Sequence, residues 1–153
     1  PIIAYNYGAG HRERVIKTMK LAALYAVAIL TFGMLLFQIF PITFLELFEA
    51  SETMISIGVP ALRIISISFP VAGACIAMGS AFQAMGRATY SMITSIARQL
   101  VVLLPMAFVL AQLGNVDLVW WSYPIAEIMS AVMTIIFLMK LNREVISKIV
   151  HKE

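Results

Sequence analysis

The sequence predicts an all-α membrane protein with four transmembrane helices, and its composition and the spacing of its charges carry that prediction. Of the 153 residues, 61% are hydrophobic and 12% are charged, and the mean hydropathy is +0.93. An ordinary globular protein is about half apolar and about a quarter charged, so a soluble domain could not cover this much apolar surface. Because a helix needs about 20 residues to cross the hydrocarbon of a bilayer, the chain has room for four crossings.

Four apolar runs mark these crossings. They are Leu21 to Ile39, the stretch between Arg63 and Arg87, the stretch between Arg98 and Asp117, and Leu118 to Met139. Only the last contains a charge, Glu127. The runs lack the alternation of a barrel strand, so we expect helices. We place them at about 15–40, 53–86, 88–113 and 117–141, after a preceding helix end and turn (1–14) and before an amphipathic cytoplasmic tail (142–153).

The flanking charges predict the orientation. Ten of the eleven basic residues precede the first helix, lie between the second and third, or follow the fourth; the exception is Arg63. The opposite loops are acidic, with Glu49 and Asp117 among their residues. Basic loops stay in the cytoplasm, so both ends of the chain are predicted to be cytoplasmic. Trp120 and Trp121 then fall at the outer boundary, where aromatic side chains concentrate.

The tail, KLNREVISKIVHKE, allows two interpretations. Its apolar residues Leu141, Val145, Ile149 and Val150 fall near one helical face, which suits an interfacial helix on anionic lipid. Alternatively, the tail is a solvated helix end that only fixes the topology.

Prolines and small residues suggest how the helices pack. Pro70 lies in the middle of the second crossing, where it would free the carbonyl of Ser66, so we expect either a hinge or a simple kink there. Small residues repeat every four positions in the second and fourth helices, which allows close helix contact. The two stripes are Gly73, Ala77, Ala81 and Ala126, Ser130, Thr134.

The side chains do not favour catalysis or metal binding. Both histidines, His11 and His151, lie outside the apolar runs, and no second intramembrane acid accompanies Glu127. Cys75 is the only cysteine, which excludes an internal disulfide and a multi-cysteine metal cluster; its neighbours suggest a small buried apolar side chain. The basic cluster before the first helix is explained by topology, so no nucleic acid partner is expected.

Five segments, taken in their order along the chain, indicate a protein family. They are PIIAYNYGAGHRERV at the start, LRIISISFP at Leu62 to Pro70, AFQAMGR at Ala81 to Arg87, RQLVVLLP at Arg98 to Pro105 and WWSYPIAE at Trp120 to Glu127. Together they resemble helices nine to twelve of the multidrug and toxic compound extrusion (MATE) family. The first segment is similar to the turn that ends the second helix of each six-helix lobe in that family.

The resemblance implies a fold, partners and a function. The chain would form part of the C-terminal six-helix lobe of a twelve-helix transporter. Its partners would be the lipid bilayer, the N-terminal lobe, and helices seven and eight. Such transporters export amphipathic, often cationic drugs across the inner (plasma) membrane by alternating access, driven by Na⁺ or H⁺, with no other cofactor. The family's cation-binding acids lie on helices outside this chain or on helix ten; since the stretch from Arg63 to Gly86 has no Asp or Glu, we assign no cation ligand there and the coupling ion stays open.

Two other functions remain compatible with the sequence. A lipid-linked oligosaccharide flippase of the same superfamily would share the fold but should have a strongly cationic cavity. A membrane anchor or assembly protein would explain the topology but not the five segments.

Four polar or charged residues within the crossings are candidate site residues. Arg63 and Glu127 each lie ten residues inward of an outer-side residue, so at 1.5 Å per residue they could pair about 15 Å inside the membrane. The alternative is that Arg63 sits at the outer interface, because the run from Ile64 to Gly86 is long enough to span alone. Gln83 and Gln99 are candidate cavity-lining residues.

The charge partition predicts which positions are accessible from outside the cell. Cysteines introduced as Glu49→Cys and Asp117→Cys should react with a membrane-impermeant thiol reagent added to intact cells, whereas Lys17→Cys and Ser147→Cys should not. Labelling of the tail position from outside would overturn the orientation and the family resemblance with it.

Overall fold

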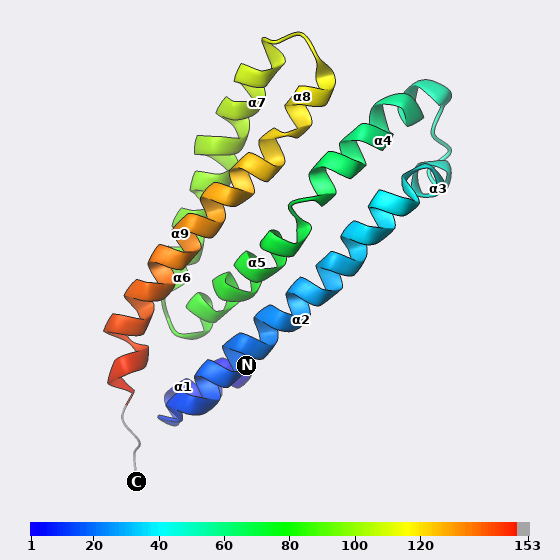
Figure 1. Cartoon of the computed structure of the whole chain (residues 1–153). Coiled ribbons are helices and arrows are strands. Elements are labelled where there is room, and N and C mark those ends of the chain that lie inside the picture. Colours follow the sequence, from blue (N-terminus) through cyan, green and yellow to red (C-terminus); the bar gives the residue numbers. More distant parts are fainter. Residues whose placement is uncertain (150–153) are drawn as a thin grey trace.

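The computed structural model describes residues 1–149, and every regular element among them is a helix. The long helical stretches run in alternating directions along the bundle, and the α1 helix lies at the same end of the bundle as the end of α9 (Figure 1). The elements are α1 (Ile2–Gly8), α2 (Arg12–Ile39), α3 (Pro41–Glu46), α4 (Glu52–Ser66), α5 (Phe69–Ala84), α6 (Ala88–Ile96), the π-helix η1 (Ala97–Leu103), α7 (Leu104–Ala111), α8 (Val116–Trp120), α9 (Ser122–Glu144) and the 3₁₀ turn η2 (Ile146–Lys148).

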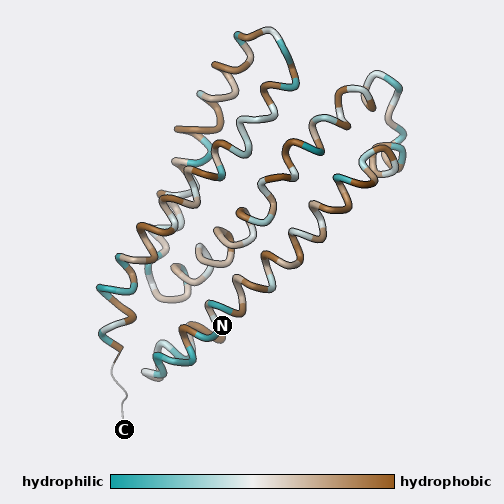
Figure 2. The backbone as a smooth tube through the Cα atoms, viewed as in Figure 1, coloured by the Kyte–Doolittle hydropathy of each residue, from teal (hydrophilic) through white to brown (hydrophobic). Residues whose placement is uncertain are grey.

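Within residues 1–149, three helical stretches are long and apolar enough to cross a membrane: Arg12–Ile39, Ala88–Ala111 and Val116–Lys148. The pair α4–α5, bent by 53°, supplies a fourth crossing if it is taken as one broken span. Hydrophobic residues run along these helices, with hydrophilic residues gathered toward the turns at their ends (Figure 2). The predicted all-α membrane fold is confirmed.

Local sequence signals set the turns between the crossings. Gly86 and Gly114 have φ values of +74° and +79°, a region that glycine enters without steric cost, and each follows the end of a helix. Ser51 begins α4 by accepting a hydrogen bond from the Met54 amide, and Asn115 begins α8 in the same way with the amide of Asp117. These signals make each reversal of the chain short.

The second crossing breaks just before Pro70. Proline has no N–H, so the Ser66 carbonyl loses its helical partner, and the Ile67 amide donates to Ile64 three residues back. The Arg63 carbonyl loses the Ile67 amide by this tightening, and it accepts instead from the Gln38 side chain of α2 (2.6 Å) and from the Ser66 hydroxyl (3.1 Å). The same Gln38 amide nitrogen donates to the Ser66 hydroxyl (2.9 Å). The sequence predicts a hinge or a kink at Pro70; the structure contains a break there, and hinge motion stays a prediction.

The third crossing changes its helical form ahead of Pro105. Pro105 lacks the N–H that would bond the Val101 carbonyl, and residues Ala97–Leu103 adopt the wider π-helical turn before α7 resumes. The crossing is nevertheless continuous from Ala88 to Ala111. Arg98 therefore lies inside the third crossing, within the predicted bounds 88–113, although the charge pattern counted it among the basic residues that flank this crossing. This changes the set of charges within the membrane.

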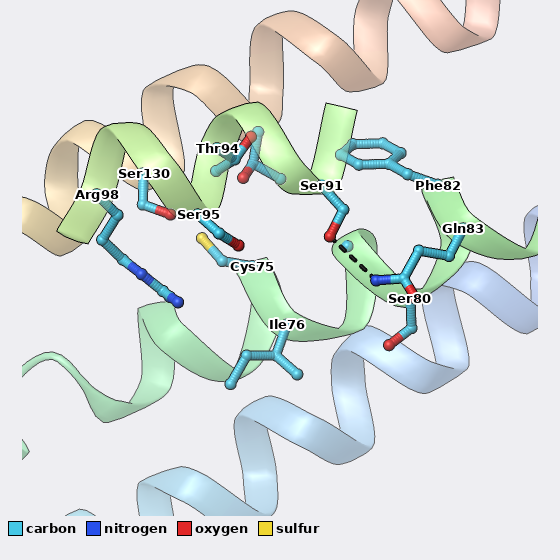
Figure 3. A pocket seen from close by; sticks show the side chains of 12 residues that line it. Cys75, Ile76, Ser80, Phe82, Gln83, Ser91, Thr94, Ser95, Arg98 and Ser130 are labelled. Atoms are coloured by element: carbon cyan, nitrogen blue, oxygen red, sulfur yellow. Dashed lines mark hydrogen bonds between the residues drawn. The ribbon is translucent and has the colours of Figure 1, made fainter. Parts of the chain in front are cut away.

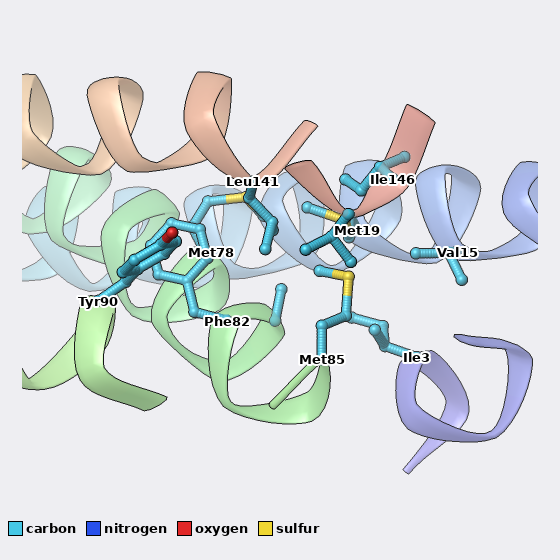
Figure 4. Close-up of a cluster of buried hydrophobic side chains, with 11 residues drawn as sticks. Ile3, Val15, Met19, Met78, Phe82, Met85, Tyr90, Leu141 and Ile146 are labelled. Atoms are coloured by element: carbon cyan, nitrogen blue, oxygen red, sulfur yellow. The ribbon is translucent and has the colours of Figure 1, made fainter. Parts of the chain in front are cut away.

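A hydrophobic core closes the end of the bundle that is predicted to be cytoplasmic (Figure 4). Phe82 of α5 and Leu141 of α9 are almost completely buried in it, together with Ile3, Val15, Met19, Met78, Ala81, Met85, Tyr90, Val145 and Ile146. The Tyr90 ring stacks on Phe137, with centroids 4.7 Å apart, and its hydroxyl donates to Glu144 (3.1 Å). This core joins α1, α2, α5, α6 and the end of α9.

The tail differs from the predicted segment 142–153. The α9 helix continues to Glu144, and Leu141 and Val145 pack into the core instead of lying free on a membrane surface. Ile146 does the same from η2. The burial of these residues attaches the tail to the bundle, and the rest of the predicted segment, 150–153, lies outside the described residues.

Close packing of α2 on α5 depends on Gly73. A Cβ at this position would lie 2.8 Å from the Ala26 carbonyl oxygen and 3.0 Å from its carbon, both backbone atoms that cannot move aside alone. The small-residue stripe predicted on the second crossing thus allows a backbone-to-backbone contact.

We expect Gly73→Ala to lower the unfolding free energy by about 1–3 kcal/mol, because α2 and α5 must separate to admit the methyl group. The matched control is Gly33→Ala on α2, where the nearest atom is a Phe69 side-chain carbon at 3.9 Å. The control should be neutral or stabilising by up to about 1 kcal/mol, since alanine is the better helix former. Thermal unfolding in detergent measures both; equal effects of the two substitutions would contradict the contact.

Candidate functional site

Glu127 of α9 and Arg98 of η1 form an ion pair inside the bundle. Glu127 Oε2 lies 3.7 Å from Arg98 Nη1, and the side chains are 9% and 26% exposed. Glu127 belongs to the buried face of α9, which also carries Ala126, Ser130 and Thr134. A charge within a membrane-spanning helix is costly unless it is paired or hydrated, so the two residues compensate each other.

The predicted pair of Arg63 with Glu127 is not the one found, because Arg98 occupies the position beside the carboxylate. Arg63 is exposed on α4. Counting residues from the outer boundary gave Arg63 a suitable depth, whereas Arg98 was counted as a flanking charge and not as a partner for Glu127. Since the third crossing begins at Ala88, Arg98 lies ten residues, or about 15 Å, within it. An outer-interface position for Arg63 stays a prediction.

A polar cavity of about 200 Å³ lies beside the ion pair, between α5, α6, η1 and α9 (Figure 3). Its wall is rich in hydroxyl groups, and among its lining residues Arg98 is the charged one. The full lining is Cys75, Ile76, Gly79, Ser80, Phe82, Gln83, Ser91, Thr94, Ser95, Arg98, Ser130 and Thr134. Gln83 donates to the Ser91 hydroxyl (3.1 Å) at one side of the cavity.

Several polar atoms around the pair have no hydrogen-bond partner among the described residues. They are Arg98 Nε, Glu127 Oε1 and Ser130 Oγ, all of them buried. Buried polar atoms are nearly always hydrogen-bonded in native proteins, and exceptions call for an explanation in ligand, water or function. The three atoms come from two neighbouring elements, which makes this region the strongest candidate site in the described chain.

A second cavity of about 110 Å³ also borders Arg98. Glu127, Arg98 and Tyr123 line it together with Ser68, Gln99, Leu103 and Ala126. Ser68 is in the break that precedes Pro70, so the irregular part of the second crossing reaches the ion pair. Of the two glutamines singled out in the sequence, Gln83 lines the first cavity and Gln99 the second. Contact of either with a transported molecule stays a prediction.

The sequence did not indicate two members of the site. Arg98 was counted as a basic residue flanking the third crossing, although the predicted bounds of that helix, 88–113, already place it ten residues inside. Cys75 was interpreted as an apolar core residue; it is buried, but it lines the polar cavity near Ser130 and Thr134. Arg98 and Cys75 both lie near the face of α9 that carries Ser130 and Thr134. The periodicity of the sequence does not reveal this proximity, because it depends on how the helices pack.

The helices are long and apolar enough to cross a membrane, and they surround a polar interior that contains an ion pair. The protein is therefore a multi-pass membrane protein with a polar site inside its helix bundle. The family model MatE matches residues 1–109, more than two thirds of the chain. The chain therefore belongs to the MatE family of membrane transporters, and the resemblance to the MATE family is confirmed. The matched range includes Arg98 and ends before Glu127. Comparison with curated proteins and with solved structures gave no match.

The geometry predicts energetic coupling between Arg98 and Glu127. Arg98→Gln and Glu127→Gln should each destabilise the protein, because each leaves a mostly buried charge without its partner. The double substitution should cost less than the sum of the two by about 1 kcal/mol or more, measured from unfolding in detergent.

The control cycle replaces Arg98→Gln with Arg63→Gln. Its effect should add to that of Glu127→Gln within about 0.5 kcal/mol, as expected of residues that do not interact. If the effects of Arg98→Gln and Glu127→Gln are additive while those of Arg63→Gln and Glu127→Gln are coupled, Glu127 pairs with Arg63, as the sequence suggested, and not with Arg98.

Proposed function

We propose that this chain is part of a secondary active exporter of amphipathic, often cationic small molecules, working by alternating access in the plasma membrane. The observation that supports this most directly is the Arg98–Glu127 pair inside the crossings of a MatE-family transporter. Ionisable residues within membrane-spanning helices are energetically costly, and they typically take part in the movement of ions or substrates. The remaining helices of the transporter would complete the substrate path.

The site favours H⁺ over Na⁺ as the coupling ion at Glu127. A guanidinium 3.7 Å from the carboxylate repels a second cation at the same oxygen atoms. A proton, in contrast, binds covalently and needs no coordination shell. Protonation of Glu127 would remove its attraction for Arg98 and so bias the packing of η1 against α9. Besides Arg98, the titratable groups near Glu127 in the described site are Cys75 and Tyr123.

The broken second crossing offers a place for this bias to act on the conformation. Ser68, in the break, lines the same cavity as Arg98 and Glu127. A change in the pair could thus alter the angle between α4 and α5, with Gln38 and the Ser66 hydroxyl both donating to the Arg63 carbonyl in the bent state. Inward proton binding and outward substrate binding then favour opposite-facing states, which is sufficient for exchange.

The proposal predicts proton-coupled efflux by the full gene product that contains this chain. Expressed in cells lacking their main efflux pumps, it should lower accumulation of a fluorescent organic cation, and an imposed pH gradient should drive that transport in vesicles. Glu127→Gln should reduce gradient-driven transport at least about tenfold, because the proton-binding group is gone. Asp117→Asn, outside the site in a turn-proximal helix, is the matched control.

Three results would count against the proposal. If a Na⁺ gradient drives the transport and a pH gradient does not, the coupling ion is Na⁺ and not H⁺. Translocation of a lipid-linked oligosaccharide, without efflux of organic cations, would favour the flippase function. Efflux by the 153-residue chain expressed alone would contradict the dependence on further helices.

A further inference from the structure

The 200 Å³ cavity beside Arg98 has the chemistry of an anion site. Its polar wall consists mainly of groups that can donate a hydrogen bond: the guanidinium of Arg98, the amide of Gln83, and the hydroxyls of Ser80, Ser91, Ser95, Ser130 and Thr134. The Thr94 hydroxyl also lines the cavity but already donates to the Tyr90 carbonyl. No carboxylate is among these lining residues of the described chain. Figure 3 shows these groups arriving from α5, α6, η1 and α9.

Two of the donors are unused. Ser130 is 1% exposed, lines the cavity, and its hydroxyl has no hydrogen-bond partner among the described residues. Arg98 Nε is likewise buried and unpartnered. A guanidinium carries five N–H groups, and the one close carboxylate oxygen, at 3.7 Å, is beyond hydrogen-bond distance. Arg98 therefore retains the capacity to bind a second negatively charged group.

The size of the cavity restricts the ligand. The cavity has a volume of about 200 Å³. Pockets for drug-sized molecules are about 300–1,000 Å³. A small ion with part of its hydration shell fits, whereas the transported drug does not.

We propose that this cavity binds a small monovalent anion, a halide or a carboxylate the size of acetate, held by Arg98 and the Ser130 hydroxyl. Arg98 lines both cavities; Glu127 lines the second and lies close to Cys75, which lines the first. The anion and Glu127 therefore compete for one guanidinium. The site is inferred from its own lining and does not depend on which molecule the transporter exports.

This competition gives the proposal a distinctive signature. Neutralising Glu127 removes a repulsive charge and frees Arg98, so it should strengthen anion binding, whereas a cation site would lose its ligand. An increase in affinity cannot come from a misfolded variant. Loss of Arg98 should instead abolish binding.

The experiment measures equilibrium binding of radiolabelled chloride, acetate and sodium to the purified full gene product by scintillation proximity. The wild type should bind chloride or acetate saturably. Competition between the two anions shows which of them the site binds more tightly. Glu127→Gln should tighten anion binding at least about tenfold. Ser130→Ala should weaken it about tenfold, as expected of a hydrogen bond to a charged group. Arg98→Gln should abolish it, and the control Arg63→Gln, which removes a charge exposed on α4, should leave it unchanged.

Absence of saturable chloride and acetate binding to the folded wild type would overturn the proposal. So would weaker anion binding in Glu127→Gln, or sodium binding that Arg98→Gln strengthens. Each variant is first checked for a wild-type elution volume in detergent, so that loss of binding is assigned only to folded protein.

Discussion

A charge placed within a membrane-spanning helix has to be compensated by another part of the protein, and in this chain the compensation joins η1 to α9. The pair of Arg98 and Glu127 fixes which faces of the third and fourth crossings meet. The hydroxyl-bearing residues on those faces, including Ser95 and Ser130, are consequently gathered around the guanidinium. Because a lone buried charge costs several kcal/mol, a register of these helices that separates the pair is disfavoured.

Two prolines make the surroundings of this pair irregular. Pro70 breaks the second crossing, and Pro105 follows the π-helical stretch that contains Arg98. Each removes a backbone hydrogen bond within the membrane, where unsatisfied groups are expensive. Gln38 of α2 compensates the first break by donating to the Arg63 carbonyl. Departures from regular helix thus occur where the second and third crossings approach the site, while the core around Phe82 and Leu141 holds the other end of the bundle.

This division of the bundle suits a transporter. The end with the hydrophobic core is well packed, with Tyr90 stacked on Phe137 and bonded to Glu144. The ion-paired region contains two polar cavities and buried atoms without partners. Regions of low packing and unsatisfied polarity are those in which conformational changes cost least. An anion beside Arg98 and a proton on Glu127 would both change the interaction between Arg98 and Glu127. The two proposals therefore concern the same ion pair.

The sequence by itself determined the positions of the apolar runs and their helical type. Apolar length and the need to satisfy every backbone group in lipid are local properties, so runs such as Leu21 to Ile39 dictate helices wherever they pack. Pro70 likewise fixes its break locally, through a missing N–H. Only the tertiary structure decided that Glu127 faces Arg98 and not Arg63, and that Cys75 borders a polar cavity. Those outcomes depend on where each helix begins and which face it turns to its neighbour, and both are set by contacts between residues far apart in the chain.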